Sequence, residues 1–427
     1  MLLDAVKNGN LKMANLFVLS ASENAKNNAL VEAAKGGYFN IVHMLMNNGA
    51  DINYRNDELY TPLMAAAQTG KYETVLALLP YAGLEVDKKG TQGMNALHLA
   101  AQNGYLDIVK ALIETGEADV RAETVSLAEP LHFAAAGGHD DIVTYLISKG
   151  AKVDASGGAK GDTPLILAAR NGNFSTVKLL INTHDADVNA RNDTGQNVLL
   201  AALELGAGFT DIALWLVKEG GSKVNKCDGL GRSAVFYAAA YKDLVLAQAL
   251  ISKGADVNEP DNGGATPLMS ATVNNDAAMM ELLLDNKANV DAQDNVYYGK
   301  HNNCTALMYA VQYGNAEAVK LLLEHGASVH TVNQANETAL MLVGSVEVRS
   351  AAMYMWDVAK LYDNNVPSAT KLQIAQLLLD NGADESLDFV DRYAMTAMDH
   401  ALEDADLKAL LLKYGAKTYR EMVAQWK

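Results

Sequence analysis

One pattern recurs along almost the whole chain, and its period restricts the possible folds more than any other feature of the sequence. Each copy opens with a residue that can cap the start of a helix. These residues are Asn28, Thr61, Asn95, Glu129, Thr163, Asn197, Ser233, Thr266, Thr305, Thr338 and Thr396. Successive copies start 33, 34, 34, 34, 34, 36, 33, 39, 33 and 58 residues apart. Self-similarity at this period predicts an array of stacked helix pairs.

The copy between Gly93 and Val120 shows what one unit contains. Asn95 can cap a first helix, and Gly104 can end it. A second helix follows, with apolar residues at helical spacing: Leu106, Val109, Leu112 and Ile113. Two helices this short cannot bury their own apolar faces, so each pair needs a neighbouring copy on either side.

The start of several copies resembles the Thr-Pro-Leu-His-x-Ala-Ala signature of ankyrin repeats. This signature is carried by Thr61–Ala67, Asn95–Ala101 and Thr163–Ala169. Gly49–Asn53 and Gly254–Asn258 are similar to the Gly-Ala-Asp-Val-Asn turn of that family. The resemblance implies an all-α ankyrin-repeat solenoid, in which stacked helix-turn-helix repeats carry β-hairpin or turn fingers. It also implies about eleven repeats and a partial N-terminal one.

We expect residues 1–427 to form a single domain, because each repeat contacts only its neighbours in a continuous stack. Its parts are a partial N-terminal capping repeat at 1–27, regular repeats at 28–337, a repeat with a long inserted helix at 338–395, and a C-terminal repeat with a capping helix at 396–427. Paired alanines, such as Ala168 and Ala169, keep the inner helix of each pair thin. The array should therefore curve, with the inner helices and the finger tips on its concave side.

Two intervals are longer than the others. Residues 295–303 lengthen one finger by about six residues and include the adjacent Tyr297 and Tyr298. The interval that follows Thr338 is longer by about 25 residues, and residues 348–362 within it carry apolar side chains at helical spacing. The sequence therefore predicts a projecting finger and an inserted helix.

The charge balance argues against one class of partner. The formal net charge is −17 and the isoelectric point is about 4.9, so the phosphate backbone of a nucleic acid would be repelled. An acidic surface is compatible with a basic protein partner, although such residues more often serve only to keep a long surface soluble. We expect a protein partner and no nucleic acid. No apolar run approaches the length of about 18 residues that a membrane span needs.

No catalytic arrangement stands out in the sequence. Gly157–Thr163 superficially suggests a phosphate loop, but it lacks the Gly-Lys-Ser/Thr order and leads into a repeat helix. His98 and His132 occupy the structural histidine position that the ankyrin resemblance implies, and no metal-ligand spacing is present. Cys227 and Cys304 fall on turns about two layers apart, too far for a disulfide. We predict no catalytic residue, no metal and no cofactor.

The predicted binding site lies on the ends of the inner helices, which the ankyrin resemblance implies as partner contacts together with the finger tips. Tyrosines gather in the layers that start at Ser233, Thr266 and Thr305. The candidate residues are Tyr237, Tyr241, Asn274, Tyr297, Tyr298, Tyr309 and Tyr313. Tyrosine is common at binding hot spots because it offers a large apolar area and a hydroxyl group. For Tyr237 and Tyr309, the competing interpretation that the rings only fill space between helices has equal weight.

The function predicted from the sequence is a non-catalytic scaffold that binds a protein through its concave face. The alternative is the recognition arm of a larger enzyme, channel or exported effector whose other segments are absent. An enzyme built on the inserted helix is least favoured, because no nucleophile and base are paired there. We expect a cytoplasmic location, or an exported or periplasmic one if a signal peptide preceded Met1. The identity of the partner and the oligomeric state stay open.

Overall fold

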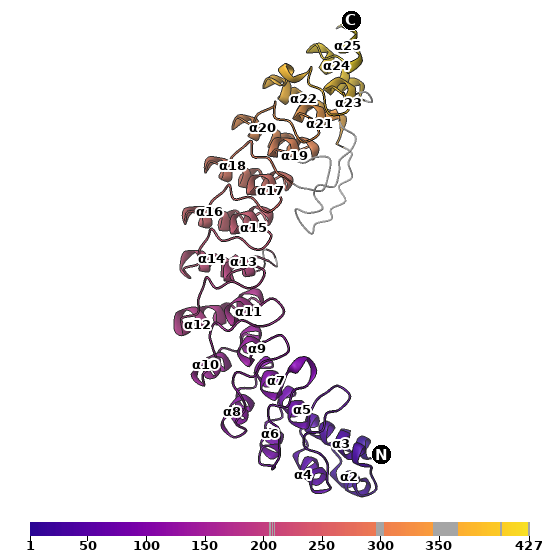
Figure 1. The fold of residues 1–427 in the computed structure, drawn as a ribbon, viewed down its shortest axis with the longest axis vertical. Coiled ribbons are helices and arrows are strands. Elements are labelled where there is room, and N and C mark those ends of the chain that lie inside the picture. The colour runs from indigo at the N-terminus through magenta and orange to yellow at the C-terminus, as the bar shows by residue number, and fades with distance from the viewer. Residues whose placement is uncertain are drawn as a thin grey trace. The chain divides into compact units, whose positions relative to one another are not determined.

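The computed structural model of the chain describes residues 1–204, 206, 208, 210–295, 303–344, 366–401 and 404–425. Its regular elements are helices joined by turns, and the described residues contain no β-strand (Figure 1). The chain divides into two compact units, Met1–Ser222 and Lys223–Lys427, each a stack of helix pairs. The predicted all-α repeat solenoid is confirmed, while the single domain stays a prediction.

In the first unit, each pair consists of an inner and an outer helix. The pairs are α1 (Leu2–Lys7) and α2 (Leu11–Val18), α3 (Glu23–Gly36) and α4 (Phe39–Asn47), α5 (Pro62–Gln68) and α6 (Tyr72–Leu78), α7 (Ala96–Gln102) and α8 (Leu106–Glu114), α9 (Pro130–Gly137) and α10 (Asp140–Ser148), α11 (Pro164–Arg170) and α12 (Phe174–His184), and α13 (Val198–Leu203) and α14 (Thr210–Lys218). From α3 to α11, each inner helix packs against the next inner helix, the last of these contacts being that of α11 with α13.

The second unit repeats this arrangement. Its pairs are α15 (Ala234–Ala240) and α16 (Leu244–Ser252), α17 (Pro267–Val273) and α18 (Ala277–Asp285), α19 (Ala306–Gln312) and α20 (Ala316–Glu324), α21 (Ala339–Gly344) and α22 (Ser368–Asp380), and α23 (Ala397–His400) and α24 (Ala405–Lys413). The last helix, α25 (Tyr419–Gln425), lies where the sequence predicts an added capping helix.

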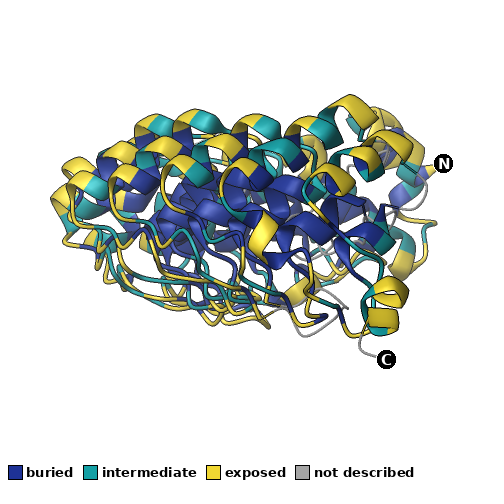
Figure 2. Ribbon diagram, turned by 90° about the horizontal axis from the view of Figure 1, so that it is seen from above, coloured by how far each residue is buried: buried dark blue, intermediate teal, exposed yellow. Residues whose placement is uncertain are grey.

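Small side chains let the inner helices stack closely. Ala66, Ala100, Ala134 and Ala168 stand at the same position of successive repeats, and all four are fully buried. The outer helices bury one apolar stripe and expose their other side, as the colouring by burial in Figure 2 illustrates. The core of each unit is therefore a layer between its inner and outer helices.

The predicted helix caps are present in most repeats. Thr61, Asn95 and Thr163 each accept a hydrogen bond from the backbone N–H of the third residue of the following helix. Pro62 and Pro164 occupy the first helical position, where a missing N–H breaks no hydrogen bond. The same side-chain cap is found at Asn197, Ser233, Thr266, Thr305 and Thr396.

The cap predicted at Asn28 is wrong. Helix α3 begins at Glu23, and its cap is Ser22, whose hydroxyl accepts the N–H of Ala25. Asn28 lies inside the helix and donates its side-chain amide to the carbonyl of Asn24. A serine followed by a glutamate is itself a good helix start, so this helix begins earlier than the repeat period indicates.

Most fingers are turns held by one polar side chain, which stands five residues before the helix cap; before Asn95 and Thr163 this position is a glycine. We call this residue the finger anchor. Asp228, for example, accepts the N–H groups of Leu230 and Arg232, both at 2.9 Å. The equivalent pair of backbone hydrogen bonds is accepted by the side chains of Asn56, Asn192, Asp261, Asn333 and Asp391. The anchor therefore satisfies backbone donors that have no strand partner.

Successive finger tips are joined by backbone hydrogen bonds, a row that we call the finger ladder. In the first unit, Val125 donates its N–H to the carbonyl of Gln92 at 2.9 Å. Gly158 donates to Ser126 at 2.8 Å, and the N–H of Asp193 lies 2.9 Å from the carbonyl of Lys160. In the second unit, the ladder includes Asn262 to Leu230, Asn295 to Gly263 and Arg392 to Ala335. Neighbouring repeats are thus linked at the tips as well as through the core.

Two predicted segments fall outside the described residues. They are residues 296–302 of the lengthened finger, which include Tyr297 and Tyr298, and residues 345–365, which include the predicted inserted helix. The base of the lengthened finger is described: Asp294 donates its N–H to the carbonyl of Cys304 at 3.1 Å. The Asp294 carboxylate accepts the Cys304 N–H at 2.8 Å in return. This finger is therefore closed at its base by an anchor of the same kind.

Candidate functional site

Three of the predicted binding residues lie at equivalent places in three consecutive layers of the second unit. Tyr241, Asn274 and Tyr313 each follow the last residue of an inner helix, α15, α17 and α19. All three are half-buried, so part of each side chain reaches solvent. Asn274 donates its amide to the carbonyl of Ala240 in the preceding layer at 3.1 Å. These three residues therefore lie on one face of the second unit, which is formed by the ends of the inner helices.

Tyr237 and Tyr309 have a different position, one turn earlier in the same helices. Both rings are buried, and each hydroxyl group donates to the anchor of its own finger, Asp228 at 2.7 Å and Asp294. Burial raises the pKa of both phenols. It also raises the pKa of the Asp294 carboxyl. These two tyrosines pack inside the layer and fix the fingers.

The ring of Tyr241 rests on one of these buried tyrosines. Its centroid lies 6.2 Å from that of Tyr237 with an interplanar angle of 23°, a stacked pair. Because the hydroxyl of Tyr237 is bound to Asp228, the surface on which Tyr241 lies is fixed. Tyr241 is therefore held close to one orientation before any partner arrives, which reduces the entropy that binding would remove.

The contact between a finger anchor and the following inner helix is visible in the sequence as a pair of residues nine positions apart, which the sequence analysis did not use. Where the anchor is aspartate, the residue nine positions later carries a polar group, as in Asp228 with Tyr237 and Asp391 with His400. Where the anchor is asparagine, that residue is apolar, as in Asn192 with Ala201 and Asn333 with Leu342. The second carboxylate oxygen needs a donor or a compensating partner, whereas the amide does not carry charge. This pairing identifies the packing role of Tyr237 directly.

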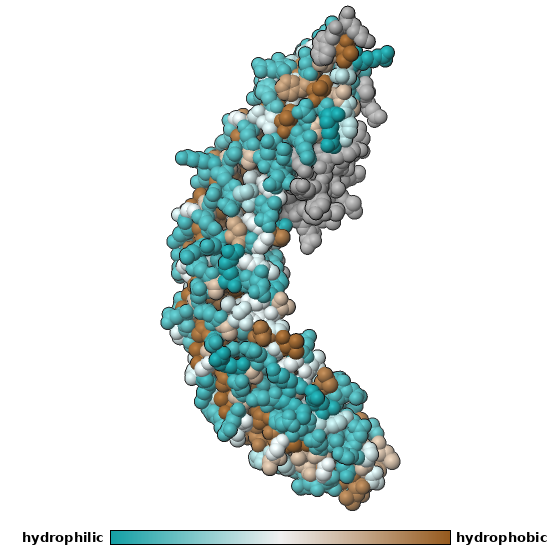
Figure 3. Space-filling model, in the orientation of Figure 1, coloured by the Kyte–Doolittle hydropathy of each residue, from teal (hydrophilic) through white to brown (hydrophobic). Residues whose placement is uncertain are grey.

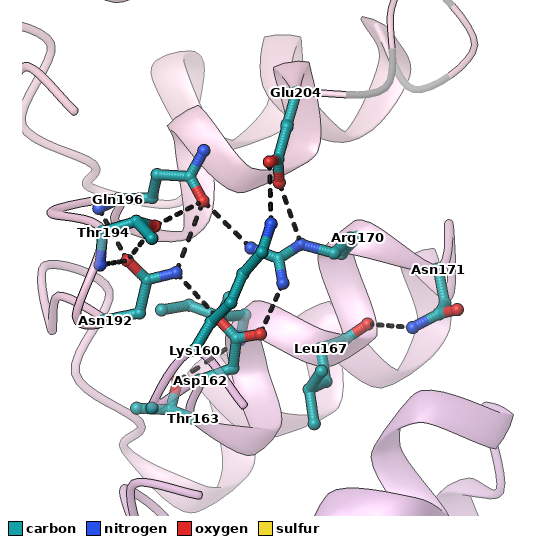
Figure 4. A network of polar contacts seen from close by, with 12 residues as sticks. Lys160, Asp162, Thr163, Leu167, Arg170, Asn171, Asn192, Thr194, Gln196 and Glu204 are labelled. Carbon is teal, nitrogen blue, oxygen red and sulfur yellow. Dashed lines mark hydrogen bonds and ion pairs between the residues drawn. The ribbon is translucent and has the colours of Figure 1, made fainter. Parts of the chain in front are cut away.

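A polar network in the first unit joins the layers that start at Thr163 and Asn197 (Figure 4). Arg170, at the end of α11, contacts a carboxylate of Asp162, the side-chain oxygen of Gln196 at 2.9 Å and Glu204 at 3.2 Å. Lys160 pairs with the other oxygen of Glu204 at 2.9 Å. One guanidinium group therefore contacts two carboxylates and one amide, which come from two repeats.

The remaining oxygen of Asp162 connects this network to the next finger. It accepts the side-chain amide of Asn192 at 2.7 Å, and Asn192 is the anchor of that finger. Gly157 and Asp162 form an isolated antiparallel bridge, so the glycine-rich run is a repeat finger. The network pairs carboxylates with amides and cations, an arrangement that stabilises the layers.

Two histidines of the first unit hold fingers. Nδ1 of His98 accepts the N–H of Asn95 at 3.2 Å, and its Nε2 lies 3.2 Å from the carbonyl of Ala128 in the next finger. His132 makes the same two contacts, with Glu129 and Ala155, both at 3.0 Å. Burial lowers the pKa of His98 to about 4 and also lowers that of His132. Both rings are neutral structural groups at pH 7.

The finger tips of the first unit expose apolar side chains in an unfavourable backbone conformation. Leu59 and Leu127 stand two residues before a helix cap with φ of 64°, in the left-handed region, where the later fingers have Gly161 and Gly195. Leu127 is 58% exposed and the neighbouring Val125 is 81% exposed. Apolar surface is visible on the finger side of the first unit in Figure 3. Exposure and strain together make these tips a second candidate contact surface, which pattern reading missed.

Cys227 and Cys304 form no disulfide with each other, as the sequence predicts. Cys304 is buried at the base of the lengthened finger, and burial raises its thiol pKa. In the described ranges, no helix is both long and apolar enough to cross a membrane.

The chain matches two sequence patterns of one family. The pattern for ankyrin repeats in three copies matches residues 2–90, 82–157, 154–228 and 208–294, and the single ankyrin-repeat pattern matches residues 302–334. These matches cover most of the chain, so the protein belongs to the ankyrin-repeat family. Ankyrin repeats are in general protein–protein interaction modules, and proteins built from them are typically non-catalytic.

A similar stretch occurs in Alpha-latroinsectotoxin-Lt1a from Latrodectus tredecimguttatus. The two sequences are 42% identical over 60 residues, which is 14% of this chain and 4% of that protein. The chain therefore matches only a small part of the length of this relative.

Proposed function

We propose that this protein is a non-catalytic scaffold that binds another protein through the second unit, on the face that the sequence predicts to be concave. The binding residues are Tyr241, Asn274 and Tyr313. The observation that carries the proposal is their register: three half-buried side chains follow three neighbouring inner helices, α15, α17 and α19. A partner that spans these layers would meet two aromatic rings with an amide between them.

The chemistry of these residues favours a protein partner. A half-buried tyrosine offers apolar ring surface and a hydroxyl group at once, and few rotatable bonds are frozen when it binds. Tyr241 is already stacked on Tyr237. The net charge of −17 favours a partner segment that carries basic side chains beside apolar ones.

The test compares the intact chain with a Tyr241→Ala and Tyr313→Ala double variant. Both are used as bait in lysate of the source cells, and captured proteins are identified by mass spectrometry. A protein that the double variant loses is then titrated against both baits, and its dissociation constant should rise by a factor of about five or more, because hot-spot truncation removes over about 1 kcal/mol. Tyr72 and Tyr419 are exposed tyrosines on other helices, so Tyr72→Ala with Tyr419→Ala is the matched control. Equal capture by all three baits would contradict the proposed surface.

A second candidate is the recognition arm of a larger enzyme, channel or exported effector. The observation that favours it is the 60-residue similarity to a protein in which that stretch makes up only 4% of the length. The full open reading frame in the source genome decides this point, because further domains would follow or precede the repeats. An open reading frame that encodes these repeats alone would exclude the arm.

A further inference from the structure

Three side chains with metal-binding atoms meet where the repeats that start at Thr338 and Thr396 are in contact. They are Glu337, Asp391 and His400, and one ligand atom of each lies within 4.8 Å of the other two. Nε2 of His400 is 3.2 Å from Oδ2 of Asp391. Glu337 and Asp391 are 5% and 4% exposed, so both carboxylates are withdrawn from water.

Backbone and amide contacts hold this group in place. The Oδ1 atom of Asp391 accepts the N–H groups of Tyr393 and Met395 at 2.8 and 2.9 Å, which leaves Oδ2 directed toward His400. Glu337 accepts the side-chain amide of Asn333 at 2.8 Å. Each carboxylate is thus oriented by a neighbouring hydrogen-bond donor, as the ligands of metal sites are oriented by the groups that surround them.

A glycine brings the two repeats close enough for this meeting. Helix α21 packs against α23, and Gly344 ends α21. A Cβ atom at Gly344 would lie 2.7 Å from the carbonyl carbon of His400, closer than a side chain tolerates. The backbone of α21 therefore approaches the residue that carries the imidazole ligand.

The same contact in other layers does not set two carboxylates against each other. Asp162 occupies the position of Glu337 in its repeat and meets the amide of the anchor Asn192. Arg232 occupies it in another repeat, and its positive charge acts on the anchor Asp261. Glu337 and Asp391 instead bring two carboxylates of low exposure close to the imidazole of His400, a set of metal-ligand atoms that the other two contacts lack.

We propose that Glu337, Asp391 and His400 bind one divalent transition-metal ion of the Zn²⁺ type. Two carboxylate oxygens and one imidazole nitrogen are a donor set that Zn²⁺ accepts, whereas Ca²⁺ and Mg²⁺ prefer oxygen donors throughout. In a tetrahedral site with ligands at about 2.0–2.1 Å, neighbouring ligand atoms lie roughly 3.3 Å apart. The Asp391–His400 separation already meets this value, so mainly Glu337 has to move inward.

The ion joins two repeats. Glu337 belongs to the finger before α21, while Asp391 and His400 belong to the finger and inner helix of the repeat that starts at Thr396. Residues 345–365 lie between these repeats in the sequence. A bound ion therefore fastens the layers on either side of that segment, and it acts independently of the surface proposed for the protein partner.

The chain supplies its own templates for variants that preserve the fold. Glu337→Gln copies the Asn192–Gln196 finger, in which the asparagine side chain lies 3.3 Å from the glutamine oxygen. Asp391→Asn with His400→Leu copies the neighbouring pair of Asn333 and Leu342, nine residues apart. Each substitution thus removes a ligand and retains a finger that this protein already forms.

The experiment uses the full chain after treatment with a chelator. Isothermal titration with Zn²⁺ should find one site per chain, and Zn²⁺ should raise the melting temperature. Glu337→Gln should weaken binding at least about tenfold, and the Asp391→Asn, His400→Leu variant should abolish it. Co²⁺ in place of Zn²⁺ should give the intense visible absorption of a tetrahedral site in the wild-type chain and not in the Asp391→Asn, His400→Leu variant.

His330→Gln is the matched control. His330 is a more exposed histidine of the same unit, 3.8 Å from Glu385, and its loss should leave the Zn²⁺ affinity unchanged. The proposal is overturned if the wild-type chain binds no Zn²⁺, if the ligand variants keep its affinity, or if Ca²⁺ binds as tightly as Zn²⁺. Loss of the Zn²⁺ site in the His330→Gln variant would equally overturn it.

Discussion

The two units build the same finger turn with different chemistry. In the first unit, the anchors that accept backbone hydrogen bonds are uncharged: Asn56, Thr124 and Asn192. In the second unit, Asn333 is joined by four aspartates: Asp228, Asp261, Asp294 and Asp391. The turn therefore accepts either an uncharged or a charged side chain as its anchor. Three of the charged anchors, Asp228, Asp294 and Asp391, also meet a polar group of the inner helix that follows.

The units also differ in how they compensate a buried carboxylate. In the first unit, Asp162 faces the guanidinium group of Arg170. In the second, Asp228 and Asp294 face the hydroxyl groups of Tyr237 and Tyr309. A guanidinium group cancels the charge, whereas a hydroxyl group only solvates it, so the consequences of removing the partner should differ between the units.

Arg170→Met should have the largest effect. It leaves the Asp162 carboxylate buried without its cation, and loss of one partner from such a pair lowers the free energy of unfolding by about 3–5 kcal/mol. Denaturation of the full chain in urea measures this loss. Lys160→Met is the control, because Lys160 is partly exposed and its pair with Glu204 contributes no more than about 1 kcal/mol. Equal losses in both variants would show that the buried ion pair has no special weight.

Acid should weaken the histidine-held fingers of the first unit next most strongly. Because burial lowers the pKa of His98 from 6.5 to about 4, the unfolded chain binds the proton more tightly than the folded chain between these values. The stability present above pH 6.5 is therefore lost as the pH falls toward 4, and the full shift corresponds to roughly 3 kcal/mol.

Thermal unfolding of the full chain between pH 7 and 4 measures this acid effect. His98→Gln keeps an uncharged polar side chain and should flatten the pH dependence relative to the wild-type chain. A wild-type slope in the His98→Gln variant would contradict the neutral buried ring.

Tyr309→Phe should have a smaller effect in the second unit. It removes the hydroxyl group that donates to the buried Asp294, and a hydrogen bond to a charged group contributes about 1.5–3 kcal/mol. The double variant Tyr309→Phe with Asp294→Asn should be more stable than Tyr309→Phe alone, because the amide anchors of other fingers are followed by apolar residues. A double-mutant cycle from urea denaturation gives the coupling energy, and strictly additive effects would exclude the pairing.

Leu127→Gly should change stability least, and in the opposite direction. Glycine adopts the left-handed φ of this finger tip without the strain of a leucine, which should stabilise the fold by about 1 kcal/mol. Leu230→Gly is the control: Leu230 is an exposed finger leucine of the second unit without a positive φ, so glycine should not stabilise there. A melting temperature that rises for Leu230→Gly but not for Leu127→Gly would overturn the assignment of strain.

The repeat, its caps and its inner and outer helices could be predicted from the sequence because they follow from local spacing. Thr61 and Thr163 cap helices where the period places them. The exception is α3, which starts at Ser22 because a local helix signal precedes the periodic position. At Thr61 and Thr163 the local helix-start signals coincide with the repeat period, so the fold could be predicted from the sequence.

The roles of individual polar residues were harder to predict from the sequence, because they depend on pairs of residues in different parts of a repeat. Tyr237 and Tyr241 look alike in the sequence, yet the first is bound to Asp228 inside the layer and the second is half-buried at the surface. Glu337 and His400 are 63 residues apart, and only the packing of α21 on α23 brings them together. Neither contact follows from a regular spacing of residues in a single sequence.

The finger ladder has a consequence for how a gene of this kind can change in length. Each of its bonds joins residues about one repeat apart: Gln92 with Val125, Ser126 with Gly158, and Lys160 with Asp193. Duplication or excision of one complete repeat returns every tip to a neighbour of the same geometry. Recombination in whole repeats is therefore compatible with an intact row of tips, and the array can grow or shrink without a new interface.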